Sequence, residues 1–323
     1  MQLRKRQKSA PSPAADPVQA LNQTWSKYAR EWADRPDLNL GTKVLGEEWG
    51  GPEFAERIIT EVAAPFLGDV DVLELGCGGG KFSAHLRERT RHLTCADISS
   101  DMLARTKAHV GEGPDVSYLQ LNGRDFEGVA DTSIDFIYSY DVLLHLQPQN
   151  VFSYLLSARR ILRPGGVILI HAINLDSPGG SYHFEVQYVQ DTWSRPFDDP
   201  HRLGHIYYMS EDQLGALAQL GRYSMHRVVS DWPAVGDPMW PVTSGRDIFG
   251  FLRREPALHE VEGVRVVKTP DERLFALVDG KRRAFTMREI FDQAGFTDAD
   301  LEPIDAAELE AIPEDQPVSR WEL

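Results

Sequence analysis

Cysteine is scarce in this sequence, and long apolar runs are absent. Cys77 and Cys95 are its only cysteines, which excludes a disulfide framework and is typical of a reducing cytoplasm. No apolar run approaches the roughly 18 residues that a membrane-spanning helix needs, so we expect no contact with a membrane. Residues 1–17 are basic but lack the apolar core of a secretory signal. We therefore expect a cytoplasmic protein.

Positive charge is also in short supply. The chain carries 34 Lys and Arg residues against 49 Asp and Glu residues, a net charge of −15. Nucleic-acid-binding surfaces usually show a basic excess, so we expect no nucleic-acid partner. Residues 1–19 are the exception, because their basic, Ser-, Pro- and Ala-rich composition predicts a disordered tail, with a lipid- or RNA-contacting arm as the lesser alternative.

Residues 20–64 are predicted to form a helical N-terminal cap. Apolar residues recur at helical spacing up to Trp32, and Pro36 ends that pattern. A second helix is expected from Pro52 to about Phe66.

From residue 65 to 255, predicted strands and helices alternate. Such alternation favours an α/β fold in which helices cover both faces of a mostly parallel sheet. We expect seven strands, at residues 70–75, 92–98, 116–121, 134–142, 167–175, 223–230 and 246–255. Residues 176–208 interrupt the pattern, and we interpret them as an inserted loop of the kind that often serves function.

Residues 259–323 are predicted to form a separate small α+β unit. Its pattern indicates a strand, a hairpin that turns at Asp279-Gly280, and a helix. Because about 65 residues make only a marginal core, we expect this unit to pack on the main domain or on a partner.

The stretch VLELGCGGGKF, residues 72–82, predicts a ligand site. A strand, a glycine-rich turn and a helix N-terminus together expose backbone N–H groups that suit a nucleotide-like ligand. A dinucleotide loop would need a glycine at position 81, where this chain has Lys81. The pattern present is Glu74-x-Gly76-x-Gly78-x-Gly80.

That pattern resembles the first motif of the class I S-adenosylmethionine-dependent methyltransferases. Further blocks follow in the order that this family shows: Asp97 after the second strand, LNGRDF after the third, DTSIDFIYSYDVLLHL at the fourth and ILRPGG before the fifth. The resemblance covers roughly residues 20–255. It implies the seven-stranded class I methyltransferase fold and S-adenosyl-L-methionine as cofactor.

The expected cofactor contacts lie at the carboxyl ends of the strands. Glycines allow the backbone to approach the ligand, Glu74 suits the methionine amino end, and Asp97 can accept hydrogen bonds from both ribose hydroxyls. Other contacts are implied mainly by the resemblance. The full expected set is Tyr28, Glu74, Gly76, Gly78, Gly80, Asp97, Ile98, Asn122, Gly123, Arg124 and Tyr140.

Methyl transfer to an oxygen is helped by a general base. The candidates are His171, His145 and Asp141, with a buried structural histidine as the alternative interpretation of His171. Residues expected to contact the acceptor are Trp49, Tyr182, His183, His205 and Tyr207. His201 and His205 have a spacing that could bind a metal, but Pro200 and Gly204 favour a loop, so no metal is predicted.

The sequence therefore predicts methyl transfer from S-adenosylmethionine to a small-molecule or glycan acceptor, with a hydroxyl oxygen as the first choice. S- or N-methylation of a small metabolite, such as a thioether amino acid, is the enzymatic alternative. The other alternative is a protein that binds the cofactor without catalysis and acts as a regulator or an assembly subunit. The C-terminal unit resembles a small module appended to assorted bacterial proteins, for which a docking role is expected, and a homodimer through it stays open.

Overall fold

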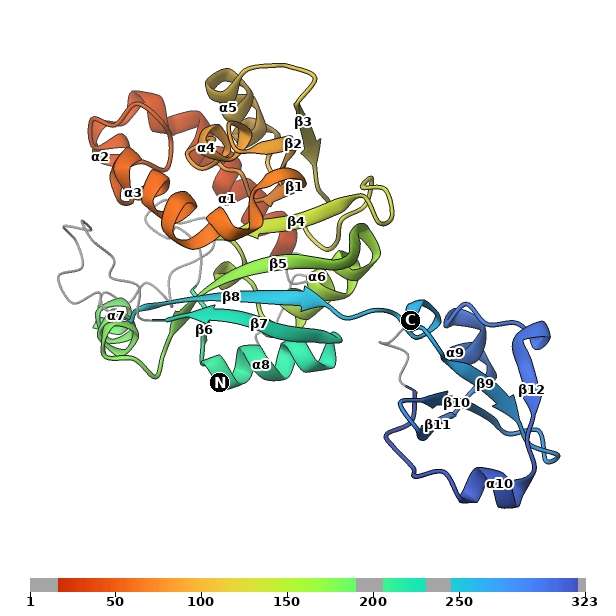
Figure 1. Cartoon of the computed structure of the whole chain (residues 1–323). Helices are drawn as coiled ribbons and strands as arrows, with labels where there is room; N and C mark the ends of the chain where they lie inside the picture. The colour runs from red at the N-terminus through yellow and green to blue at the C-terminus, as the bar shows by residue number, and fades with distance from the viewer. Residues whose placement is uncertain (1–16, 190–205, 231–244, 319–323) are drawn as a thin grey trace, which may run out of the picture.

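The computed structural model describes residues 17–189, 206–230 and 245–318, and within them it contains two β-sheets (Figure 1). The larger sheet has the strand order β3-β2-β1-β4-β5-β8-β7, and a short strand, β6, pairs with the end of β5. Its strands are β1 (Gly68–Leu75), β2 (Thr90–Asp97), β3 (Val116–Gln120), β4 (Ile134–Ser139), β5 (Leu162–Asn174), β6 (Tyr208–Met209), β7 (Tyr223–Val229) and β8 (Asp247–Arg254).

The predicted mostly parallel α/β sheet is confirmed. Strands β1 to β5 pair in parallel, while β8 runs antiparallel to both β5 and β7. The expected count of seven strands holds for the main path, and β6 is an addition that the pattern did not predict. Strand β5 also begins earlier than the expected residue 167, because Pro164-Gly165-Gly166 lies within the strand, where the register to β4 shifts.

Apolar side chains cover both faces of the central strands, which is why this sheet needs helices on both sides. In β1, Leu73 packs into one face and Val72 into the other. The covering helices are α4 (Ser83–Arg87), α5 (Ser100–Val110), α6 (Pro148–Ile161) and α8 (Glu211–Leu220). Within the described residues, no helix is both long enough and apolar enough to cross a bilayer.

The N-terminal cap is helical, as predicted. Helix α1 (Pro17–Glu31) runs into a 3₁₀ turn, and Pro36 then opens the short α2 (Pro36–Asn39), because proline is well tolerated at a first helical position. Helix α3 (Gly51–Arg57) continues through a π-helical stretch, Ile58–Ala63, whose apolar side chains are buried in the core cluster on one face of the sheet.

The insertion at 176–208 is not simply a loop, so that prediction was wrong for its first part. Pro178–Val189 forms helix α7, although its Pro-Gly-Gly start is typical of a turn. The Ser177 hydroxyl accepts a hydrogen bond from the Gly180 N–H at 3.0 Å and so supports the helix start. A Cβ at Gly180 would lie 1.7 Å from the Asn174 carbonyl oxygen, so the glycine allows α7 to pack directly on the end of β5.

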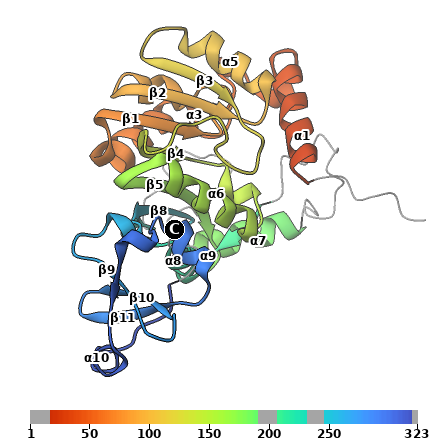
Figure 2. The ribbon, with the colours of Figure 1, turned by 90° about the vertical axis from the view of Figure 1, so that its right-hand side faces the viewer.

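The C-terminal residues form the second sheet, in the order β11-β10-β9-β12. Both Asp279 and Gly280 have positive φ, as the predicted hairpin turn requires. In Figures 1 and 2 this sheet lies beyond the β8–β7 edge of the main sheet, with its own apolar core. Its elements are β9 (Arg265–Lys268), β10 (Leu274–Val278), β11 (Lys281–Phe285), α9 (Arg288–Gln293), β12 (Leu301–Pro303) and α10 (Ala306–Glu310).

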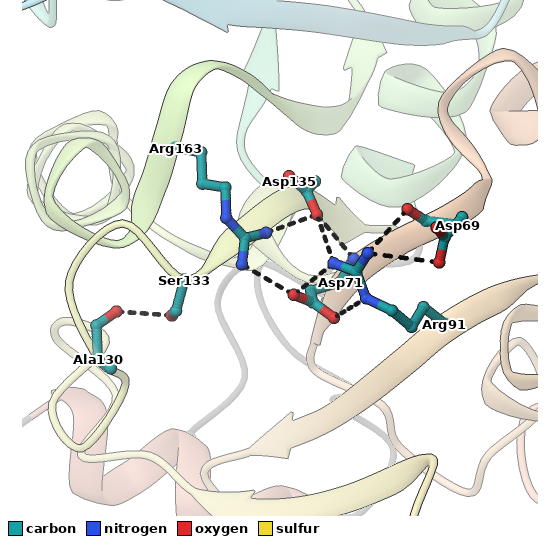
Figure 3. A network of polar contacts seen from close by, with 7 residues as sticks. All are labelled: Asp69, Asp71, Arg91, Ala130, Ser133, Asp135 and Arg163. Atoms are coloured by element: carbon teal, nitrogen blue, oxygen red, sulfur yellow. Dashed lines mark hydrogen bonds and ion pairs between the residues drawn. The ribbon is translucent and has the colours of Figure 1, made fainter.

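Charged side chains join the amino ends of β1, β2, β4 and β5, opposite the carboxyl ends where the sequence predicts the ligand (Figure 3). Arg91 donates to both carboxylate oxygens of Asp71, at 3.0 and 2.8 Å. Arg163 bridges Asp71 and Asp135, at 2.9 and 2.6 Å. These contacts connect four neighbouring strands at their amino ends.

Candidate functional site

A cavity of about 510 Å³ opens at the carboxyl ends of β1, β2 and β4. This is where open α/β sheets bind their ligands. The lining of the cavity includes the glycine-rich loop that follows β1 and Asp97. Asp141, His145, His183 and Arg246 also line it, together with the aromatic side chains of Trp25, Trp49 and Tyr140.

The glycines of the loop serve different contacts. Gly76, Gly78 and Gly80 all have positive φ, where L side chains are strained. A Cβ at Gly76 would lie 2.3 Å from Val142, so Gly76 allows the loops after β1 and β4 to meet. Gly78 faces open space in the cavity wall, whereas Gly80 packs on α5 and does not line the cavity. Gly78 is therefore the position where a ligand can approach the backbone most closely.

Asp97 ends β2 with its carboxylate at the cavity. Its Oδ2 accepts a hydrogen bond from the Gly78 N–H at 3.0 Å, and its Oδ1 accepts one from the Ser99 N–H at 2.9 Å. Burial raises the pKa of Asp97 to about 6, although these backbone bonds favour the charged form. Each carboxylate oxygen retains accepting capacity, so the group fits a vicinal pair of ribose hydroxyls. Ile98, also in the cavity wall, offers an apolar surface beside it.

Glu74 does not line this cavity. It is buried behind the loop and accepts a hydrogen bond from the Ser83 hydroxyl, and burial raises its pKa to about 8. Asn122 and Arg124 are exposed outside the cavity, with the Asn122 side chain bonded to Asp125. Of that segment only Gly123 reaches the wall, where a Cβ would collide with Val18 of α1.

Tyr28 supports the wall rather than forming it. Its hydroxyl donates to the Glu48 carboxylate at 2.5 Å, and its ring stacks on Trp49 with centroids 5.5 Å apart. Trp49 does line the cavity, and Tyr28 lies behind it. The structure thus brings together Trp49, Tyr140, Gly76, Gly78, Asp97, Ile98 and Gly123 from the predicted set.

Asp141 lies where the chain leaves β4 and lines the cavity. Its φ is +55°, an uncommon conformation for a residue other than glycine. About half of its side chain, 49%, is accessible, because it opens into the cavity. Contact with His171 lowers the pKa of Asp141 and outweighs the opposing effect of burial. The cavity therefore presents an ionised carboxylate.

His171 lies behind Tyr140, with the rings stacked at 4.2 Å, and is only 1% exposed. Its Nδ1 is 3.1 Å from Asp141 Oδ1, and its Nε2 is 3.2 Å from Asp247 Oδ1. Burial alone would lower the pKa of His171, but the two carboxylates prevail and raise it to about 9. The Asp141 N–H, 3.2 Å from Nδ1, is the partner when the ring is neutral. This geometry does not favour His171 as the base, because the ring is protonated at neutral pH and does not reach the cavity.

Arg246 and Asp247 complete this network, and sequence reasoning missed both. Arg246 donates to both oxygens of Asp247, at 2.9 and 3.0 Å, and lines the cavity. Arg246 directly precedes β8 and Asp247 is its first residue, which the pairing places opposite Ile173 of β5. A charged pair directly before the apolar run of 248–252 was the available signal.

The histidines in the wall differ in environment. His145 packs against Trp25, with ring centroids 5.4 Å apart. His183 is buried beside the Tyr208 hydroxyl at 2.7 Å, and burial lowers its pKa to about 4, so it is neutral at pH 7. Tyr182 points away on α7 and Tyr207 lies outside this cavity, while His205 falls outside the described residues. Those described residues contain no cluster of three or more potential metal ligands.

The large sheet, with parallel strands β1 to β5 and antiparallel β8, has the fold of the class I S-adenosylmethionine-dependent methyltransferases. Residues 73–170 match the family model described as a methyltransferase domain. This segment contains the glycine-rich loop, Asp97 and Asp141, so the match covers residues that build the site.

Curated relatives support the same assignment at low identity. The chain is 28% identical over 104 residues to a ubiquinone biosynthesis O-methyltransferase of Aeromonas salmonicida, which is 32% of this chain and 43% of that protein. It is 23% identical over 147 residues to phosphoethanolamine N-methyltransferase 1 of Caenorhabditis elegans, covering 45% of this chain and 29% of that one. The match spans less than half the length of either relative.

Solved structures share the fold. Magnesium protoporphyrin IX methyltransferase from Synechocystis, with bound SAH, superposes with a TM-score of 0.52 at 12% identity over 74% of this chain and 100% of that one. Phosphoethanolamine N-methyltransferase 1 of Haemonchus contortus gives a TM-score of 0.52 at 19% identity, over 78% and 52% of the respective chains.

Proposed function

We propose that this protein transfers the methyl group of S-adenosylmethionine to a hydroxyl oxygen of a small-molecule or glycan acceptor. The observation that carries the proposal is a single cavity lined by Gly78 and Asp97 and also by the ionised Asp141. A cofactor held by Gly78 and Asp97 would share this cavity with an acceptor held beside Asp141. In-line displacement depends mainly on this alignment and on the exclusion of water.

The residues present suit the cofactor. Gly78 leaves room for its backbone approach, Asp97 can accept from its ribose hydroxyls, and Ile98 offers a surface to its base. When bound, the cofactor would supply an electrophilic methyl group on a positively charged sulfur. Its charge would be compatible with the aromatic walls formed by Trp25, Trp49 and Tyr140.

Asp141 is the base that the geometry favours. It faces the cavity, is ionised, and is held from behind by His171, so it can accept the proton that an acceptor hydroxyl loses as its oxygen bonds to the methyl carbon. His145 and His183 also reach the cavity and are available to orient the acceptor. His171 then acts through Asp141 rather than on the acceptor.

N-methylation of a small amine is the second candidate. An ionised Asp141 beside aromatic walls also suits a cationic acceptor. The similarity to the nematode phosphoethanolamine N-methyltransferases is compatible with this alternative. The two candidates differ in the acceptor atom and share the same cofactor contacts.

The cofactor is tested first, by calorimetric titration of S-adenosylmethionine and of NAD into the wild type and Asp97→Ala. We expect micromolar binding of the sulfonium to the wild type, at least tenfold weaker binding to the variant, and no heat from NAD. Asp131→Ala is the matched control, because Asp131 is a surface carboxylate paired with Arg160 far from the cavity. A folded wild type that does not bind the sulfonium would refute the proposal.

The acceptor is then sought with S-adenosylmethionine labelled in its methyl group. Pools of phenols, sugars and amines are offered, and the products are analysed for O- or N-linked label. Asp141→Asn should retain cofactor affinity and lose most of the transfer. Cofactor binding without transfer to any pool would instead favour a regulator or assembly subunit.

A further inference from the structure

Gly79 lines the cavity and is also in close contact with the N-terminal cap. Unlike its neighbours Gly78 and Gly80, it does not have a positive φ. A Cβ at Gly79 would lie 2.5 Å from both the Cβ and the carbonyl oxygen of Leu45. Gly79 is thus the point at which a segment from the N-terminal cap rests directly on the glycine-rich loop.

Lys81 makes a second connection between the same two segments. Its Nζ donates hydrogen bonds to the carbonyl oxygens of Gly46 and Trp49, at 2.9 and 2.8 Å. The ammonium also lies 5.1 Å from the ring centroid of Phe54 and 5.2 Å from that of Phe82. Lys81 is only 8% exposed, so its charge is held by carbonyl dipoles and aromatic faces rather than by water.

The segment held in this way, Val44–Gly50, forms a roof over the cavity. It consists of turns without a regular helix or strand, and Leu45, Gly46, Trp49 and Gly50 line the cavity directly. Glu48 stabilises the roof internally by accepting from the Gly46 N–H at 2.8 Å, and it ties the roof to α1 through Tyr28. The roof is therefore attached at both sides of the cavity.

We propose that Gly79 and Lys81 are positioning residues that latch the roof, Val44–Gly50, over the cofactor cavity and thereby set how fast S-adenosylmethionine enters and leaves. The inference rests on the proposed function, because it takes this cavity to be the cofactor site. Gly78, Gly79 and Lys81 all line the cavity, and Gly79 and Lys81 also contact the roof. Turn hydrogen bonds within the roof hold it together, but no regular helix or strand ties it to its neighbours. It can therefore open as one unit when the contacts to Gly79 and Lys81 are lost, which makes it the natural entry path.

The latch makes a kinetic prediction that a simple ligand contact does not. If Lys81 only touched the cofactor, Lys81→Met would raise the dissociation rate and leave association unchanged. If Lys81 holds the roof closed, both rates rise, because opening precedes entry as well as exit. Stopped-flow tryptophan fluorescence measures both, since Trp25 and Trp49 line the cavity.

We expect Lys81→Met and Gly79→Ala to raise both the association and the dissociation rate of S-adenosylmethionine by about tenfold. Lys81→Arg should restore rates close to those of the wild type, because a guanidinium can donate to the same two carbonyls. Lys107→Met is the matched control, as Lys107 is a half-exposed lysine paired with Glu112. Thermal unfolding of each variant separates loss of the latch from loss of the fold.

Amide hydrogen exchange of the ligand-free protein supplies an independent readout. Residues 44–50 should exchange faster in Lys81→Met, with no change in the strands of the main sheet. Association and dissociation rates within twofold of the wild type would overturn the latch. If the wild type binds no S-adenosylmethionine, the proposed function fails, and unchanged exchange of residues 44–50 in the variant then overturns the latch as well.

Discussion

Asp97 combines two effects that usually oppose each other. Its position at the end of β2 buries the carboxylate, and the N–H groups of Gly78 and Ser99 stabilise its charged form. Burial prevails, which is why its pKa rises to about 6. A ligand that donates hydrogen bonds to the carboxylate needs the charged form, so binding and protonation compete at this residue.

The affinity for S-adenosylmethionine should therefore fall as the pH drops through about 6. Below that pH, the ionised fraction of Asp97 decreases roughly tenfold per pH unit, and the affinity should follow. Asp97→Asn should bind about 10- to 100-fold more weakly at pH 8, the loss expected for hydrogen bonds to a charged group. Calorimetry from pH 5 to pH 8 measures both proteins, and the variant corrects for titration of the cofactor itself. Parallel pH profiles for the two proteins would contradict this account.

His171 links the stability of the fold to pH in a defined direction. Its pKa rises from 6.5 to about 9 on folding, so the stabilisation is fully present below pH 6.5 and is lost as the pH rises through about 9. The expected loss in unfolding free energy is about 2–4 kcal/mol. Denaturant unfolding at several pH values between 6 and 9.5 measures it.

His171→Phe is the informative variant, because phenylalanine can keep the stacking on Tyr140 and Phe249 without titrating. It should be less stable than the wild type at pH 6 and should approach it at pH 9.5. Burial also raises the pKa of Glu74, to about 8, so its ionisation lowers the stability of the fold as the pH rises. This effect is the same in both proteins. A constant difference between the two proteins over this range would refute the charged state assigned to His171.

Among single residues, the sequence predicted the site residues that directly follow a strand, in the glycine-rich motif and at the acidic positions. Gly78, Asp97 and Asp141 lie in the cavity wall because the motif spacing places them at strand ends. Arg246 and Asp247 were missed because they reach the site through the pairing of β8 with β5, more than 70 residues along the chain from His171. Local patterns carry no information about such long-range pairing.

At the scale of elements, the sequence predicted the seven strands on the main path of the large sheet, because their apolar residues follow a strand-like pattern. It failed at α7, where Pro178-Gly179-Gly180 has turn composition but tertiary packing on Asn174 favours a helix. It also failed to separate the functions of the adjacent glycines. Gly78 and Gly79 look alike in sequence, and only the structure distinguishes them, by the positive φ of Gly78 and by the contact of Gly79 with Leu45.

The contribution of the charge network at the amino ends of the strands to stability can be tested at this scale (Figure 3). Hydrogen bonds from Arg91, and also those from Arg163, lower the pKa of Asp71 below 3.8 despite partial burial. Its stabilisation is therefore present above about pH 4 and is lost as the pH falls further. We expect Asp71→Asn to lower the unfolding free energy at pH 7 by about 1 kcal/mol, since the arginines remain partly exposed and screened.

Asp69→Asn is the matched control, because Asp69 contacts the same Arg91 but is 88% exposed. Its effect should be below about 0.5 kcal/mol. Denaturant unfolding at pH 7 and pH 3.5 compares both variants with the wild type, and the Asp71→Asn difference should shrink at the lower pH. Equal effects of the two substitutions at pH 7 would show that the network adds nothing beyond a surface ion pair.

At the scale of the whole molecule, the two sheets have separate apolar cores. The clusters around the main sheet contain residues up to Leu252, and those of the second sheet begin at Leu258. Arg254 spans this junction by donating to both oxygens of Glu260, at 2.8 and 3.0 Å. The change in sequence pattern near residue 255 predicted this separation, but not the ion pair that joins the parts.

A chain that ends at Glu262 should therefore fold and bind S-adenosylmethionine within about twofold of the full chain, because no cavity residue lies beyond Arg246. A chain that ends at Ala257 lacks Glu260 and leaves the guanidinium of Arg254, only 6% exposed, without its carboxylate partner. That should cost a further 1–3 kcal/mol or so. Denaturant unfolding and calorimetry of the three chains measure both quantities. If the chain that ends at Glu262 did not bind the cofactor, the C-terminal unit would be needed to complete the methyltransferase domain and would not be merely attached to it.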